Sequence, residues 1–156
     1  MVEAQEGLAM RMTEAQQSLL LHWKHMREKR GGLPARGDFR LQDLGRHVTD
    51  IVVMDILEEP ADFRYRLIGT HASEYLNRDY TGKTLSSLPG KGPGSKIWEN
   101  LNTAKHSKEP QHLKVPYVGP QAAFKVAYTL YLPLASDHKH PDKLILVTSF
   151  SKKDPP

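Results

Sequence analysis

The feature that most constrains the fold is the arrangement of strand-like segments in two groups, separated by a long turn-rich and helical stretch. Residues 51–57 (IVVMDIL) are apolar and β-branched, and residues 63–67 (FRYRL) alternate apolar and basic side chains with the period of two that a strand requires. The turn-forming residues 58–62 (EEPAD) between them predict a hairpin. Three more strands are predicted near the C-terminus, at residues 111–118, 123–134 and 143–151.

The stretch between the two groups of strands carries helix signals among its glycines and prolines. Thr70 can cap a short helix over residues 71–76, and Ser95 can cap a longer one over residues 96–108. Helices grouped between the second and third strands indicate an α+β fold. We therefore predict a five-stranded antiparallel sheet with short helices over one face, in a domain spanning residues 33–151.

An additional amphipathic helix is predicted before this domain, over residues 13–32. Thr13 and Gln16 fit a capping box, and a pair of glycines at 31 and 32 ends the pattern. At 100° per residue its larger apolar side chains form one stripe, which is Leu19, Leu20, Trp23 and Met26. This stripe can pack on the domain or pair with a second copy, so we predict these four residues as an interaction surface and expect a homodimer. Residues 1–12 and 152–156 are expected to be tails.

Composition excludes several classes of function. The 156 residues contain no cysteine, which rules out disulfides, thiolate metal sites and cysteine nucleophiles. No apolar run approaches the ~18 residues needed to span a bilayer, and the N-terminal residues lack the apolar core of a signal peptide, so we expect a cytoplasmic protein. The pI of about 9.3 is the only argument for nucleic-acid binding, which we do not expect because the chain lacks a concentrated basic stripe with interleaved aromatic residues.

The element order and two sequence strings resemble PAS domains of the PAS_5 type, known as short stand-alone alphaproteobacterial proteins. The strings are residues 63–70 (FRYRLIGT) and 80–85 (YTGKTL), preceded by residues 33–36 (LPAR) and the helix containing Trp23. The resemblance covers roughly residues 15–150. It implies a sensory or protein-interaction module that signals through its N-terminal helix or a dimer interface, and it does not imply an enzyme.

The resemblance also implies where a ligand would bind, namely between the concave face of the sheet and the helices. The candidate ligand-binding residues are apolar or carry one polar group, the usual composition of a small-molecule site. They are Tyr65, Leu67, Tyr75, Trp98, Leu101, Val126, Tyr128 and Thr148. The alternative is that these residues are ordinary core, which is the commoner role of aromatic side chains at strand and helix spacing. A register slip of one residue would also move a strand's set to the other face.

Known cofactor chemistry receives little support from the residues. The flavin chemistry of light-sensing PAS domains needs a cysteine, which is absent. Haem would need an axial ligand such as His106 or His71, and His106 lies among polar residues, so we do not expect haem. We expect no metal site, and the ligand and the signalling partner are left unidentified.

One charged pair is predicted to anchor the sheet. Arg66 alternates with Tyr65 and Leu67, and it would need an acidic partner if it were partly buried, with Asp55 or Glu58 on the neighbouring strand as candidates. Asp55 also carries the alternative hypothesis of a small pocket enzyme, a cystatin-like isomerase or hydrolase, which would want an acid and a histidine inside the pocket. An Asp55 paired with Arg66 on the opposite face would count against that alternative.

Overall fold

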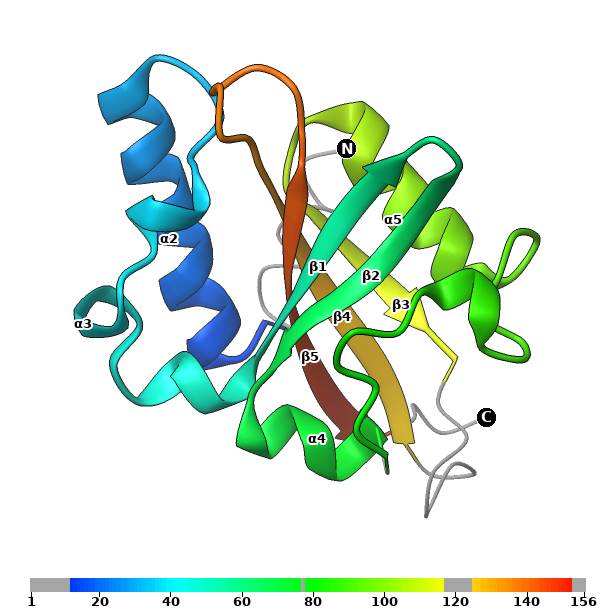
Figure 1. Ribbon diagram of the computed structural model, residues 1–156. Helices are drawn as coiled ribbons and strands as arrows, with labels where there is room; N and C mark the ends of the chain where they lie inside the picture. The colour runs from blue at the N-terminus through cyan, green and yellow to red at the C-terminus, as the bar shows by residue number, and fades with distance from the viewer. Residues whose placement is uncertain (1–11, 77, 117–124, 153–156) are drawn as a thin grey trace, which may run out of the picture.

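The computed structural model describes residues 12–76, 78–116 and 125–152 (Figure 1). Within these segments five strands form a single antiparallel sheet in the order β2-β1-β5-β4-β3. The strands are β1 (Ile51–Glu58), β2 (Ala61–Ile68), β3 (Gln111–Val115), β4 (Lys125–Leu134) and β5 (Lys143–Lys152). The predicted α+β class and five-stranded antiparallel sheet are confirmed. Most of the predicted tails, and residues 117–118 and 123–124 of two predicted strands, lie outside the described residues.

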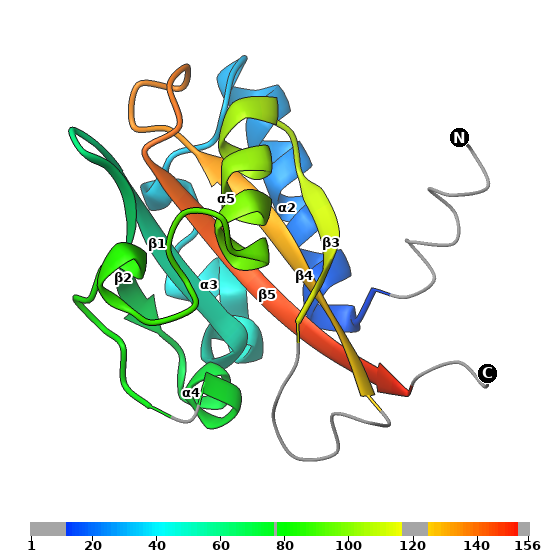
Figure 2. The ribbon, with the colours of Figure 1, turned by 90° about the vertical axis from the view of Figure 1, so that its right-hand side faces the viewer.

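Two groups of helices cover the two faces of the sheet. Helix α2 and helix α5 lie on opposite faces (Figure 2). The helical segments are α2 (Glu14–Arg30), η1 (Arg36–Asp38), α3 (Leu41–Leu44), η2 (Gly45–Asp50), α4 (Thr70–Leu76), η3 (Leu85–Ser87) and α5 (Lys96–Ser107). None of the helices in the described segments is long and apolar enough to cross a membrane.

Helix α2 begins and ends where the sequence predicts. The Thr13 hydroxyl accepts a hydrogen bond from the Gln16 N–H at 3.2 Å, and the Gln16 side chain accepts one from the Thr13 N–H at 3.1 Å. Gly31 adopts the left-handed conformation (φ 70°) and its N–H closes the last turn on the Arg27 carbonyl. The first two bonds form the predicted capping box. Gly31 is the C-cap, where a residue with a Cβ would be strained in the left-handed conformation.

The strands separate two apolar layers, because alternate side chains of each strand point to opposite faces. Ile51 and Val53 of β1 join Val147 of β5 in the core beneath α2. Val52 and Met54, the intervening residues, join the core beneath α4 and α5. Because β1 and the first half of β5 are buried on both faces, residues 51–54 and 144–147 are continuous apolar runs rather than alternating ones.

A register shift in the β1–β2 hairpin decides which way several side chains point. Met54 pairs with Tyr65, but the next residue back, Val53, pairs with Leu67, so Arg66 is an extra residue on β2. Such a β-bulge interrupts the strict alternation. Leu67 therefore follows Val53 to the α2 side of the sheet, instead of staying with Tyr65.

The glycine in the string at residues 63–70 has a packing reason. A Cβ placed on Gly69 would lie 2.4 Å from the carbonyl oxygen of Thr49, so the end of β2 can approach η2 only with glycine at this position. The Gly69 N–H bonds the Ile51 carbonyl at 2.9 Å, which fixes the start of α4 against the sheet.

Candidate functional site

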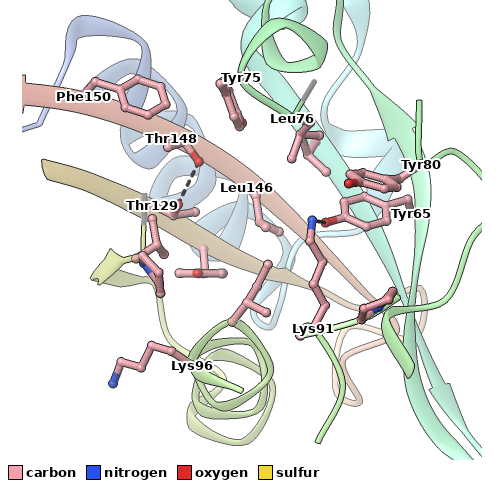
Figure 3. Close-up of a pocket in the computed structure, with 17 residues that line it drawn as sticks. Tyr65, Tyr75, Leu76, Tyr80, Lys91, Lys96, Thr129, Leu146, Thr148 and Phe150 are labelled. Carbon is pink, nitrogen blue, oxygen red and sulfur yellow. Dashed lines mark hydrogen bonds between the residues drawn. The ribbon is translucent and has the colours of Figure 1, made fainter. Parts of the chain in front are cut away.

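A cavity of about 430 Å³ lies between the sheet and the segments that connect β2 to α5 (Figure 3). This volume is within the range of small-molecule sites. Its walls combine apolar and aromatic groups with hydroxyls and two lysines. The lining residues are Val52, Tyr65, Tyr75, Leu76, Tyr80, Pro89, Gly90, Lys91, Lys96, Ile97, Val115, Pro116, Thr129, Tyr131, Leu146, Thr148 and Phe150.

Hydroxyl groups cross the floor of the cavity from β5 to β4. The Thr148 and Thr129 hydroxyls are 2.8 Å apart and hydrogen-bonded (Figure 3). Burial raises the pKa of Tyr75, and a hydrogen-bond interaction with Thr148 partly offsets the rise. Burial likewise raises the pKa of Tyr131 to about 12, against interactions with Asn100 and Thr129. These phenols are therefore neutral at physiological pH and offer polar contacts without charge.

A lysine enters the cavity from the loop after η3. The Lys91 Nζ donates a hydrogen bond to the Tyr65 hydroxyl at 3.3 Å and lies 4.3 Å from the centre of the Tyr80 ring (Figure 3). The Tyr65 and Tyr80 rings are stacked at 5.6 Å. Burial lowers the pKa of Lys91 and raises that of Tyr65. A cation held against aromatic faces in this way is partly desolvated.

Three of the eight predicted ligand-binding residues, Tyr65, Tyr75 and Thr148, line this cavity. Trp98 and Leu101 belong to the core layer on the same side of the sheet, but they are buried behind the cavity and do not line it. Their side chains point from α5 into the sheet, where Trp98 packs edge-on against Phe63 at 5.1 Å.

The other three predicted residues lie on the opposite face of the sheet. The β-bulge at Arg66 turns Leu67 outward, where 37% of it is exposed. Val126 and Tyr128 share their side of β4 with Leu130, which is buried beneath α2. Alternation correctly groups the residues of β4, but it cannot say which of the two sets faces the cavity, because both faces of the sheet are covered.

The sequence analysis did not predict the cavity residues on the alternate positions of β4, nor Lys91 in the loop after η3. Thr129 and Tyr131 alternate with the expected set, so a choice of the opposite phase would have found them. Lys91 and Tyr80 come from turn-rich segments, where no periodicity exists to predict the direction of a side chain.

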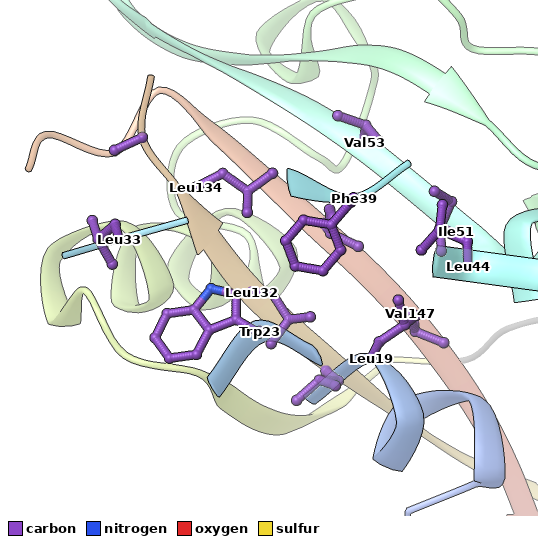
Figure 4. Packing of buried hydrophobic residues seen from close by; sticks show 13 residues of the cluster. Leu19, Trp23, Leu33, Phe39, Leu44, Ile51, Val53, Leu132, Leu134 and Val147 are labelled. Atoms are coloured by element: carbon purple, nitrogen blue, oxygen red, sulfur yellow. The ribbon is translucent and has the colours of Figure 1, made fainter. Parts of the chain in front are cut away.

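Two residues of the predicted interaction stripe on α2, Leu19 and Trp23, pack in the core between the helix and its own sheet (Figure 4). Leu19, Trp23 and Met26 are 2%, 0% and 7% exposed, and Leu20 is half-buried. The Trp23 indole N–H donates a hydrogen bond to the Pro133 carbonyl at 2.8 Å. These residues are therefore not available as a homodimer surface, because the outer face of the sheet offers the same chain an apolar partner.

Gln16 ties the start of α2 to the two strands that form the cavity floor. Its side-chain N–H₂ donates to the Val147 carbonyl at 2.8 Å and to the Tyr128 carbonyl at 3.3 Å. The residue is completely buried. Val147 directly precedes Thr148, and Tyr128 directly precedes Thr129. Gln16 thus binds the backbone of β4 and β5 immediately behind the hydroxyl pair of the cavity.

The predicted Asp55–Arg66 pair is part of a larger ion cluster that also contains Arg64 and Lys143. Asp55 is 5% exposed, and its carboxylate lies 3.0 Å from Arg64, 3.2 Å from Lys143 and 4.0 Å from Arg66. Arg66 keeps 63% of its side chain exposed, because the bulge points it to solvent. Arg64 is therefore the closer arginine, and Arg66 makes the longest of the three contacts with Asp55. The cluster lies on the face opposite the cavity.

We expect Asp55→Asn to lower the free energy of unfolding by about 1–2 kcal/mol at pH 7, discounted for the partial exposure of its partners. Burial alone would raise the pKa of Asp55, but hydrogen bonds and charge from Arg64 and Lys143 outweigh it and hold the pKa below its usual 3.8. A depressed folded-state pKa contributes stability above the unfolded pKa, and this is lost as the pH falls through the folded value. The difference between variant and wild type should therefore shrink below about pH 4.

Urea unfolding at pH 7 and pH 3 measures this, with Glu109→Gln as the matched control. Glu109 pairs with Arg27 at an exposed site and should contribute little. An Asp55→Asn loss that is equal at both pH values would contradict the electrostatic explanation.

The profile of the PAS_5 family, described as a PAS domain, matches residues 11–147. Among solved structures, the PAS domain of histidine kinase ThkA is similar, with 14% identity, a TM-score of 0.45, and coverage of 64% of this chain and 97% of that one. A variant of the same domain with two phenylalanines replaced by methionine gives the same values. No curated protein matches the chain significantly.

The family match includes α2, strands β1 to β4 and the first half of β5, and it ends just before the cavity residues Thr148 and Phe150. It also includes both strings on which the sequence resemblance depends. This chain belongs to the PAS_5 family of PAS domains.

Proposed function

We propose that this PAS domain is a sensory module that binds a small molecule in its cavity and passes occupancy to the N-terminal helix α2. The arrangement of Gln16 and the hydroxyl pair on opposite sides of the same two strands carries this proposal. A ligand that displaces or reorients Thr129 and Thr148 shifts the backbone whose carbonyls Gln16 binds. A protein partner would then respond to a change in α2.

The burial of Gln16 supports a role in which helix and sheet move together. Both of its N–H groups and its carbonyl have partners, so any displacement of β4 against β5 breaks a buried hydrogen bond. An unmade bond of this kind costs about 1–3 kcal/mol, comparable with typical coupling energies between two sites. The homodimer stays a prediction, and it would need a surface other than Leu19, Trp23 and Met26.

The alternative of a small pocket enzyme receives less support, and we propose no catalytic activity. Its candidate acid, Asp55, lies on the opposite face of the sheet in an ion cluster. The described residues that line the main cavity include no aspartate, glutamate or histidine, whereas Asp50, His71 and Glu74 border the smaller cavity next to it. General acid–base chemistry within the main cavity would therefore have to use a tyrosine or lysine, and the tyrosine pKa values are shifted away from neutrality.

Native mass spectrometry of the protein purified from its own host tests the proposal, followed by denaturing mass spectrometry of the same sample. We expect an excess mass that disappears on denaturation and that identifies the ligand. Amide hydrogen exchange of residues 14–30 should then slow when the recovered compound is added back to the stripped protein.

A bare protein whose α2 exchange is unaffected by host metabolite extracts would overturn the small-molecule proposal and favour a protein-interaction role. A bound compound with no change in α2 exchange would overturn the route through Gln16. The same spectra give the oligomeric state.

A further inference from the structure

Charged side chains of opposite sign lie at the two ends of the cavity, a feature that membership of the family does not predict. Lys91 enters at one end, and its Nζ lies over the Tyr80 ring and against the Tyr65 hydroxyl. At the other end, beyond Tyr75, a smaller cavity of about 240 Å³ is bordered by Asp50, Glu74 and His71, and the His71 ring lies 3.0 Å from the Asp50 carboxylate. The two cavities share Tyr75, Thr148 and Phe150.

Lys91 lacks a counter-ion in the part of the chain that the structure describes. Its amino group makes a hydrogen bond with a neutral phenol and cation–π contacts, and no carboxylate among the described residues forms an ion pair with it. The described lining of the main cavity holds two lysines and no acidic residue. A partly buried cation without a paired anion favours a ligand that supplies one.

The Tyr65 hydroxyl completes a two-point site for an anion. It is the acceptor in its bond with Lys91, which leaves its own proton to donate. Tyr65 is 2% exposed, and burial raises its pKa, so that proton is retained at neutral pH. A carboxylate near both groups would accept one hydrogen bond from each, and bonds to a charged group are the stronger class.

We propose that the cavity binds a small aromatic monocarboxylate, with its carboxylate on Lys91 and Tyr65 and its ring among the apolar and aromatic side chains toward Phe150. This assignment rests on the proposed function and adds the chemical class of the ligand. Lys91 supplies one partly buried positive charge, whereas Lys96, the second lysine of the lining, is exposed to solvent. Glu74 and Asp50, the latter paired with His71, place negative charge at the far end. We choose a small ligand because the cavity volume of about 430 Å³ lies near the lower end of the range for small-molecule sites.

Calorimetric titration with matched probes tests the assignment, using 3-phenylpropionate, its neutral amide and 3-phenylpropylamine. We expect the carboxylate to bind about tenfold or more tightly than the amide, as follows from a charge-assisted hydrogen bond, and the amine to bind least. Lys91→Met keeps the length of the side chain and should remove the preference for carboxylate over amide. Tyr65→Phe should weaken carboxylate binding and leave amide binding less affected.

Lys83→Met is the matched control, because Lys83 is exposed and does not line the cavity. It should keep the wild-type preference, and retained amide binding shows that Lys91→Met is folded. Equal binding of carboxylate and amide to the wild type, or a preference that survives Lys91→Met, would overturn the assignment. Absence of carboxylate binding at millimolar concentration would also overturn the assignment. The proposed sensor function is tested separately, by the mass of any compound recovered from the native protein.

Discussion

Replacing Trp23 with alanine should lower the free energy of unfolding by about 3–5 kcal/mol, the range for truncating a fully buried large side chain. Trp23 has no exposed surface and lies at the centre of the layer between α2 and the sheet. Truncation also leaves the Pro133 carbonyl without its indole donor. A loss of this size is a large fraction of the stability of an ordinary domain, so the variant should melt well below the wild type.

Two further variants separate packing from hydrogen bonding at Trp23. Trp23→Phe keeps most of the apolar contact and removes the N–H donor, so it should cost less than alanine, about 1–3 kcal/mol. Leu21→Ala is the control for helix α2 itself, because Leu21 is 69% exposed and should change stability by less than about 0.5 kcal/mol. Chemical denaturation of the three variants measures the differences. A Trp23→Ala loss no larger than that of Leu21→Ala would show that α2 does not pack on the sheet in solution.

Gln16→Glu should destabilise the protein by about 3–5 kcal/mol at pH 7, because it places an uncompensated carboxylate in a buried site. The new oxygen would face the carbonyls of Val147 and Tyr128, which now accept hydrogen bonds from the amide. Gln17→Glu makes the same chemical change one residue later on the exposed side of the helix, and its effect should stay within about 0.5 kcal/mol.

The penalty at Gln16→Glu should depend on pH in a definite direction. A buried carboxyl has a folded-state pKa above its unfolded value of about 4.3. The penalty is therefore small below the unfolded pKa, where the group is neutral in both states, and grows as the pH rises toward the folded pKa. The free energies of unfolding of Gln16→Glu and wild type should therefore differ less at pH 4 than at pH 7. A deficit that does not change with pH would mean that Gln16 acts through shape and not through the polarity of its amide.

The sequence was sufficient for local structure, because local structure depends on near neighbours. The capping box of Thr13 and Gln16 and the glycine pair at 31 and 32 correctly predicted the ends of α2. The two groups of strands correctly predicted the α+β class, and period-two patterns grouped the residues of β4 that share a face. The family resemblance at residues 63–70 and 80–85 was also correct.

Only the tertiary structure decided which face each group of side chains occupies. The two sets on β4 both look buried, since α2 covers one face of the sheet and the cavity with α5 lies on the other. The Arg66 bulge reverses the alternation of β2 after Tyr65, and its cause is the pairing with β1, which the sequence of β2 does not contain. Lys91 reaches Tyr65 across 26 positions because a loop happens to return there. Contacts between distant segments depend on how the whole chain packs, and periodicity within one segment carries no information about them.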